Sequence, residues 1–108
     1  MSNHFSWRGA KEVRKMAQNV HRCFLRAGIE VEPRVEKNGD LVIFEVSQEE
    51  LSRVKRAWPI CQVLPYTGDT VLEKGLDMRQ GVRFEIVLKV IQKNPTAEIR
   101  IEAVRIKP

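Results

Sequence analysis

The stretch from Val82 to Ile106, VRFEIVLKVIQK-NPTA-EIRIEAVRI, contains two long runs in which apolar and charged residues alternate. Alternation with a period of two is typical of β-strands, because successive side chains point to opposite faces of a sheet. Asn94–Ala97, between the runs, is predicted to form a type I turn with Pro95 in its second position. We therefore expect a β-hairpin here, at the centre of a sheet.

The predicted register of this hairpin brings opposite charges together on one face and apolar residues together on the other, which stabilises strand pairing. The expected pairs are Lys93 with Glu98, Lys89 with Glu102, Val90 with Ile101 and Leu88 with Ala103. Further apolar residues fall on the outer face, which is either covered by the rest of the fold or offered to a partner. This predicted partner-facing surface comprises Val87, Ile91, Val104 and Ile106.

A second hairpin is predicted around Asn38-Gly39, because both central residues of a type I′ turn need positive φ. Apolar residues alternate with charged ones from Ile29 to Val35, and Leu41–Val46 is the return strand. Pro33 donates no backbone hydrogen bond, so the first strand is expected at an edge of the sheet. The expected pairs are Val35 with Val42, Pro33 with Phe44 and Val31 with Val46.

A helix is predicted to follow this hairpin, from Ser47 to about Ala57. Ser47 and Glu50 have the spacing of a capping box. Leu51, Val54 and Trp58 should face inward, and Pro59 ends the helix. A basic cluster near its end complements the helix dipole. That cluster comprises Arg53, Lys55 and Arg56.

The segment that follows is harder to interpret. Ile60–Leu64 is predicted to be a short strand. From Pro65 to Gly81, glycines interrupt any apolar pattern, which indicates a long loop. A short helix beginning at Thr70–Glu73 is the alternative.

The segment from Ser6 to Gly28 is predicted to be an amphipathic helix, with Ser6 as its N-cap and Gly28 as the left-handed residue after it. Its apolar residues recur at spacings of three and four, which places them in one stripe facing the core. The stripe comprises Val13, Met16, Ala17, Val20, Cys23, Phe24 and Ala27.

The net charge of +5 is concentrated in this first segment. Residues 1–28 contain six basic side chains and one acidic side chain, whereas residues 29–108 contain thirteen of each sign. At about 100° per residue, most of these cations fall on one line, away from the apolar stripe. The predicted polyanion contacts are Arg8, Lys11, Lys15, Arg22 and Arg26, with Arg14 as a flanking charge.

We expect one α+β domain spanning residues 1–108, with residues 1–5 as a disordered tail. The expected order is α-β-β-α-β-(loop or short α)-β-β, with an antiparallel or mixed sheet of about five strands. Cys23 and Cys61 are expected to be buried free thiols, with one disulfide between them as the alternative. No stretch approaches the roughly 20 apolar residues of a membrane span, and the first residues do not resemble a signal peptide, so a cytoplasmic location is expected.

A helical face that is nearly free of acidic residues favours contact with a polyanion, most simply the phosphate backbone of nucleic acid. A solvated face without a partner is the alternative, although such faces usually mix both signs. No helix-turn-helix order, GxxG loop or paired strand aromatics accompany it, so we expect little sequence specificity. The rival hypothesis is a protein–protein interaction module, a subunit, regulator or inhibitor of a larger assembly. Its basic helix would meet an acidic protein surface, and its outer sheet face would complete a homodimer.

Catalysis is the third hypothesis, because the sequence contains no common catalytic or metal-binding motif. His4 and His21 have no partner at ligand spacing. We expect no catalytic residues, no metal and no cofactor. One weaker enzymatic alternative is a metal-dependent nuclease, using either Asp40 with Glu45 or Asp69, Glu73 and Asp77. Another is a metal-free ribonuclease that uses Tyr66, Arg79 or His21.

Overall fold

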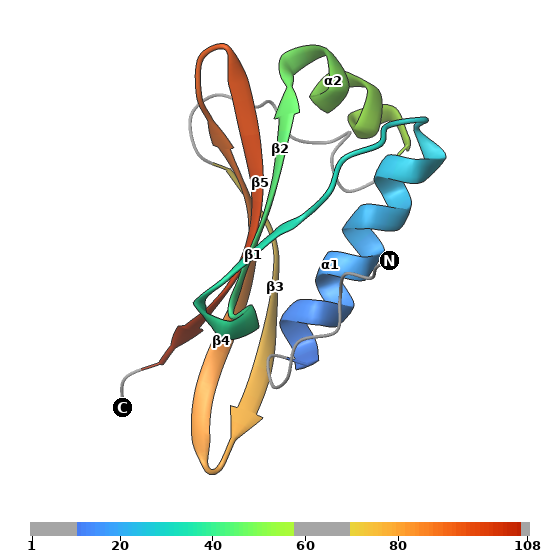
Figure 1. Ribbon diagram of the computed structural model, residues 1–108. Coiled ribbons are helices and arrows are strands. Elements are labelled where there is room, and N and C mark those ends of the chain that lie inside the picture. Colours follow the sequence, from blue (N-terminus) through green and yellow to red (C-terminus); the bar gives the residue numbers. More distant parts are fainter. Residues whose placement is uncertain (1–10, 58–69, 107–108) are drawn as a thin grey trace.

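Two helices and a five-stranded antiparallel sheet form the part of the chain that the computed structural model describes, residues 11–57 and 70–106 (Figure 1). The predicted α+β class is confirmed. The elements are α1 (Lys11–Arg26), β1 (Arg34–Glu36), the short 3-10 helix η1 (Lys37–Gly39), β2 (Leu41–Ser47), α2 (Gln48–Ala57), β3 (Thr70–Arg79), β4 (Val82–Gln92) and β5 (Thr96–Arg105).

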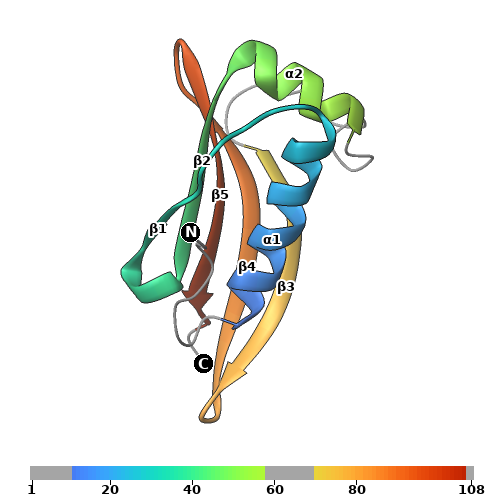
Figure 2. The same ribbon diagram turned by 45° about the vertical axis from the view of Figure 1, so that its right-hand side comes forward.

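The strands lie in the order β1-β2-β5-β4-β3, so the β4–β5 hairpin occupies the middle of the sheet and β1 forms one edge, as predicted. Both helices cover the same face of the sheet, with α1 lying across it and α2 at one end (Figures 1 and 2). We call the opposite face, on which neither helix packs, the open face.

The hydrophobic core lies between the helices and the sheet. Phe24 of α1 meets Phe44 of β2 edge to face, with ring centroids 5.2 Å apart. Burial of each large apolar side chain contributes roughly 1.5–3 kcal/mol to folding. The other buried core residues are Val13, Ala17, Val20, Ile29, Val42, Val46, Leu51, Val54, Ile86, Leu88, Val90, Ala97, Ile99 and Ile101.

Helix α1 buries the stripe that its periodicity predicted. Val13, Ala17, Val20 and Phe24 are buried, and the remaining stripe residues pack against the core as partly buried neighbours. The helix ends in a Schellman motif at Gly28, which has φ +75°. The Ile29 N–H donates to the Phe24 carbonyl over 2.9 Å, and the Gly28 N–H donates to the Leu25 carbonyl over 3.0 Å. The predicted N-cap, Ser6, lies outside the described residues.

The β1–β2 hairpin has the predicted register, with Val35 opposite Val42. Its turn differs, because Lys37–Gly39 form a 3-10 turn in which Lys37, Asn38 and Gly39 all have positive φ. The expected pairs of Pro33 and Val31 are absent from this ladder, which begins at Arg34. Pro33 lacks an N–H and therefore ends the pairing.

Helix α2 begins with the predicted capping box. The Glu50 N–H donates to Ser47 Oγ over 3.1 Å, and the Ser47 N–H donates to a Glu50 carboxylate oxygen over 2.9 Å. Gln48 binds the β4–β5 turn, because its side-chain amide donates to the carbonyl oxygens of Lys93 and Thr96. These contacts fix the start of α2 above that turn.

The predicted long loop from Pro65 to Gly81 is wrong for its second half, and so is the alternative helix at Thr70–Glu73. Thr70–Arg79 form strand β3, which pairs along β4 and makes the second edge of the sheet. Gln80 (φ +51°) and Gly81 (φ +81°) form the tight turn that joins the two strands. The alternation in β3 is weak because a bulge between Val71 and Glu73 shifts its register.

The predicted register of the β4–β5 hairpin is wrong by two residues. Lys89 lies opposite Arg100, and Val90 lies opposite Ile99. The turn is centred on Asn94 and Pro95, joined by a cis peptide bond, so Pro95 takes the third position rather than the second. A shift of two residues leaves each side chain on its predicted face, since the strand period is two.

Other predicted features fall outside the described residues, namely the strand Ile60–Leu64, the tail at residues 1–5, the polyanion contact Arg8, and Trp58 and Pro59. Within the described residues, no helix is long and apolar enough to cross a membrane.

Candidate functional site

The cations of α1 lie on the side of the helix that faces away from the sheet. Packing of Val13, Ala17, Val20 and Phe24 onto the sheet turns the opposite side of the helix toward solvent. Four of its basic side chains are exposed and Arg14 is half-buried at their margin. We call this set the basic face: Lys11, Arg14, Lys15, Arg22 and Arg26.

The basic face carries little compensating negative charge. Lys15 lies 3.8 Å from Glu12, one turn away on the same helix, and its side chain remains 64% exposed. Among the described residues, no carboxylate forms an ion pair with Lys11, Arg22 or Arg26. A pair as exposed as Lys15–Glu12 contributes at most a few tenths of a kcal/mol, roughly, so Lys15 can exchange it for another anion.

The cations of the strands and of the turns that join them are arranged differently. Six of them bind carboxylates of the same chain, whereas Arg83, Lys89 and Arg105 show no such pair within the described part of the chain. The paired cations are Arg34, Lys37, Lys74, Arg79, Lys93 and Arg100. The uncompensated positive charge of the described residues is therefore densest along α1.

Cys23 lies beside the basic face and is a free thiol, as expected. Burial raises the pKa of this thiol, while the positive charges of Arg26 and Arg22 act in the opposite direction without reversing it. Cys23 is therefore in the neutral thiol form at physiological pH. Cys61 lies outside the described residues.

Arg53 connects the two helices at the end of the basic face. Its Nη2 atom donates hydrogen bonds to the carbonyl oxygens of Ala27, over 3.0 Å, and Gly28, over 3.4 Å. The sequence suggested that Arg53 complements the dipole of its own helix, but it instead binds the carbonyl groups of the two residues that follow α1. A positive charge at this point also complements the negative end of the α1 dipole.

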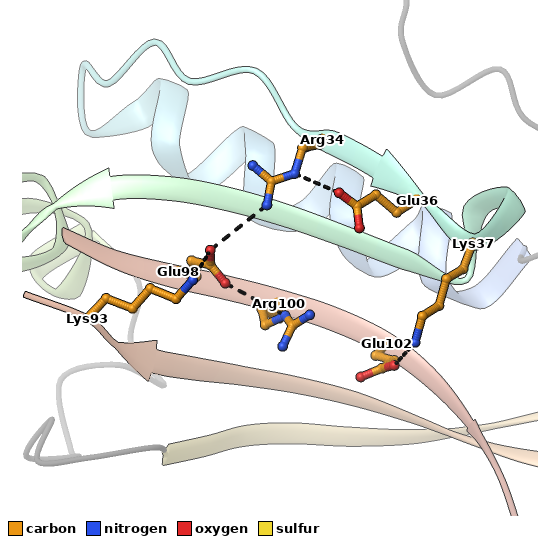
Figure 3. A network of polar contacts seen from close by, with 7 residues as sticks. All are labelled: Arg34, Glu36, Lys37, Lys93, Glu98, Arg100 and Glu102. Carbon is orange, nitrogen blue, oxygen red and sulfur yellow. Dashed lines mark hydrogen bonds and ion pairs between the residues drawn. The ribbon is translucent and has the colours of Figure 1, made fainter.

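On the open face, Glu98 is the centre of a network of ion pairs (Figure 3). Its carboxylate is 2.8 Å from Lys93 Nζ, 3.8 Å from Arg100 Nε and 3.9 Å from Arg34 Nη2. The glutamate is 5% exposed, so its charge requires these cations. The predicted Lys93–Glu98 contact thus exists, although the two residues are not directly opposite each other in the sheet.

The predicted partner-facing residues all project from the open face, but to different degrees. Val104 is 47% and Ile106 is 36% exposed, while Val87 and Ile91 are half-buried. Sequence reasoning missed two more exposed residues of this face, Leu76 (54%) and Met78 (56%), because β3 was taken for a loop. Glu85 of β4 lies opposite Leu76 of β3 on one side and opposite Val104 of β5 on the other.

The candidate catalytic sets do not assemble. Glu45 lies opposite Glu98 in the sheet and therefore projects from the open face, whereas Asp40 precedes β2 and forms an ion pair with Arg79 of β3, 2.8 Å away. Asp77 belongs to a strand, which excludes the shared helical face predicted for it with Asp69 and Glu73. Arg79 is 2.8 Å from both Asp40 and Asp77, and its guanidinium stacks 4.4 Å from the Phe84 ring centroid. These partners make Arg79 a structural link between β3 and the turn that precedes β2.

The remaining catalytic candidates add no site. Burial opposes the charge of Arg79, but its bonds to Asp77 and Asp40 outweigh burial and raise its pKa. His21 is half-buried beside Phe44, with ring centroids 6.0 Å apart. Asp69 and Tyr66 lie outside the described residues. Within residues 11–57 and 70–106, no three His, Cys, Asp or Glu side chains are grouped as metal ligands.

Comparison with known proteins provides no relative from which to transfer a function. No protein-family model matches the chain, and no curated protein or solved structure matches it significantly.

Proposed function

We propose that the protein binds nucleic acid by placing the basic face of α1 along the phosphate backbone, without catalysing a reaction. The observation that carries this proposal is the contrast in charge pairing. Lys11, Arg22 and Arg26 are exposed and form no ion pair with a described carboxylate, while six cations of the strands and their connecting turns do. When such cations neutralise phosphates, counterions condensed on the nucleic acid are released into solution, and this release drives the association.

The way α1 is held supports backbone contact rather than base recognition. A recognition helix enters the major groove with much of its surface available to the bases. In contrast, α1 buries its apolar stripe against the sheet and offers only its outer side. From Lys11 to Arg26 that side extends about 22 Å, at 1.5 Å per residue. Charged side chains on such a surface reach phosphates and carry little sequence information.

The test is a pair of charge-reversal variants with equal change in net charge. The first, Lys11→Glu with Arg22→Glu, alters two exposed residues of the basic face. The matched control, Arg83→Glu with Arg105→Glu, alters two exposed sheet cations that form no ion pair with a described carboxylate. Binding to a labelled DNA duplex and to single-stranded RNA is measured by fluorescence anisotropy, and folding by circular dichroism.

We expect the α1 variant to bind at least about tenfold more weakly than the control to both nucleic acids. An equal loss in the two variants would indicate that net charge alone governs binding. No binding of the unaltered protein below about 100 μM at low salt would overturn the proposal.

A second candidate function is a protein–protein interaction module, a subunit or regulator of a larger assembly. The exposed apolar residues of the open face favour it, because nucleic-acid binding through the basic face does not explain why Leu76, Met78 and Val104 are exposed together. In this case the basic face would meet an acidic protein surface. Retained binding to an acidic polypeptide such as polyglutamate, with no binding to nucleic acid, would favour this candidate.

A further inference from the structure

The two edges of the sheet differ in how they are protected against pairing with another strand. β1 has three residues and follows Pro33, so it offers a short edge. β3 has ten residues and contains no proline, its bulge lies near one end, between Val71 and Glu73, and no described strand pairs with its outer side. A long edge without proline is a template for another strand, and natural proteins usually cover or charge it.

The hydrogen-bonding pattern of the sheet shows which residues of β3 face outward. The Ile106 N–H donates to the Arg83 carbonyl over 2.9 Å, so Arg83 directs its backbone groups toward β5. Neighbouring residues of a strand direct these groups to opposite sides, so Val82, Phe84 and Ile86 face β3. Their partners in β3 are Arg79, Asp77 and Gly75. Lys74, Leu76 and Met78 therefore point their N–H and C=O groups away from the sheet.

The side chains at these three positions are exposed as well. Leu76 is 54%, Met78 is 56% and the Lys74 side chain is 58% exposed. Gly75, which has no side chain, is also exposed, so the backbone between them is accessible to a partner. Two adjacent apolar side chains on an unpaired edge are costly to leave in water.

We propose that a second copy of this chain pairs antiparallel with β3, about a two-fold axis at Leu76. The Leu76 residues of the two copies then form a hydrogen-bonded pair with each other. Lys74 of each copy pairs with Met78 of the other, again with two backbone hydrogen bonds per pair. The aliphatic stem of Lys74 packs on Met78 while its ammonium group stays in water.

Charge selects this register over its neighbours. An axis at Lys74 would place two ammonium groups opposite each other, and an axis at Asp77 would do the same with two carboxylates. An axis at Met78 would leave Lys74 beyond the paired segment. With the axis at Leu76, no two like charges lie opposite each other within the segment from Lys74 to Met78. The two Leu76 side chains come together at the axis.

This dimer has a continuous sheet with both copies of α1 on the same side, because a two-fold axis perpendicular to a sheet preserves its faces. The two basic faces then lie on one side of the assembly. The proposal does not rest on nucleic-acid binding, since it follows from the edge alone.

The experiment measures the mass of the unaltered protein in solution by sedimentation equilibrium between about 1 and 200 μM, with two variants for comparison. Leu76→Lys opposes two ammonium groups across the axis and should give a monomer throughout this range. Val104→Lys introduces the same charge on the same face but on an inner strand, and should remain dimeric. A monomeric unaltered protein at 200 μM would overturn the proposal, as would a dimer lost in Val104→Lys but retained in Leu76→Lys.

Cross-linking tests the register. In a Cys23→Ser, Cys61→Ser background, Leu76→Cys should be joined across the axis by a short thiol-specific linker, matched to the roughly 5 Å between opposite Cβ atoms. Met78→Cys is the control, because the two Met78 positions are about four residues, or 13 Å, apart along the strands. Efficient linkage of Met78→Cys without linkage of Leu76→Cys would contradict the proposed axis.

Discussion

The Nη2 atom of Arg53 donates a hydrogen bond to the carbonyl oxygen of Ala27 over 3.0 Å, so a residue of α2 satisfies the end of α1. The last carbonyl groups of a helix have no partner within the helix itself. Arg53 therefore links the orientation of α2 to the end of the helix that carries Arg22 and Arg26.

Replacing Arg53 with alanine should lower the free energy of unfolding by about 1 kcal/mol, because it removes charge-assisted hydrogen bonds at an exposed site. Urea denaturation measures this change. Arg83→Ala is the control, since Arg83 is an exposed arginine without such a link, and it should change stability by less than about 0.5 kcal/mol. Equal stabilities of the two variants would show that Arg53 contributes nothing to the end of α1.

Gly28→Ala should be more costly, at about 1–2 kcal/mol, because a left-handed φ of +75° is strained for a residue with a Cβ atom. That Cβ would also lie 3.3 Å from Arg53 Nη2. Gly75→Ala provides the control, since its Cβ would meet Ile86 and Met16 at an ordinary 3.9 Å. Urea denaturation should show Gly75→Ala to be neutral or slightly stabilising; a larger loss there than at Gly28 would contradict this explanation.

Arg79→Ala should destabilise the fold by about 1–3 kcal/mol, because it leaves Asp40 and Asp77 without their cation and removes the stack on Phe84. Arg79→Lys should recover part of this loss, since lysine restores the charge but cannot bind both carboxylates in the same planar geometry. Thermal unfolding of the two variants, compared with Arg105→Ala, measures the difference. A lysine variant no more stable than the alanine variant would show that charge pairing is unimportant here.

Cys23 should react slowly with iodoacetamide at pH 7.5, because burial raises its pKa and the thiolate is the reactive form. The raised pKa stabilises the fold below the ordinary thiol pKa, and this contribution is lost as pH rises through the folded-state value. The reaction rate of Cys23 should therefore rise at higher pH than the rate of a cysteine in the unfolded chain. Replacing Arg22 and Arg26 with glutamine should slow the reaction further; mass spectrometry of the Cys23 peptide measures each rate.

The sequence predicted those parts of the fold whose signals are local. The capping box at Ser47 and Glu50, the Schellman glycine at position 28 and the periodic stripe of α1 each depend on a few neighbouring residues, and each was confirmed. The central β4–β5 hairpin was also predicted, although its turn is displaced by one residue. The predicted face of each side chain in this hairpin is still correct, because the register differs from the prediction by two residues, the period of a strand.

The features that sequence reasoning missed depend on contacts between elements and not on the pattern within one element. β3 has weak alternation and an internal glycine, and it becomes a strand because β4 supplies its hydrogen bonds. The Gln80-Gly81 turn was the local signal that could have revealed it, since positive φ at two adjacent residues favours a tight hairpin. Arg53 and Arg79 were similarly unpredictable, because their partners lie 25 or more residues away, at Gly28 and Asp40.

The most direct test of nucleic-acid binding through α1 is the salt dependence of its affinity for a DNA duplex. Neutralisation of about four phosphates by Lys11, Lys15, Arg22 and Arg26 predicts a slope near −3.6 in a plot of log affinity against log salt concentration. The Lys11→Glu, Arg22→Glu variant should reduce this slope to about −1.8 or less, while the Arg83→Glu, Arg105→Glu control should leave it unchanged. A slope that is the same for all three proteins would contradict the role of the basic face.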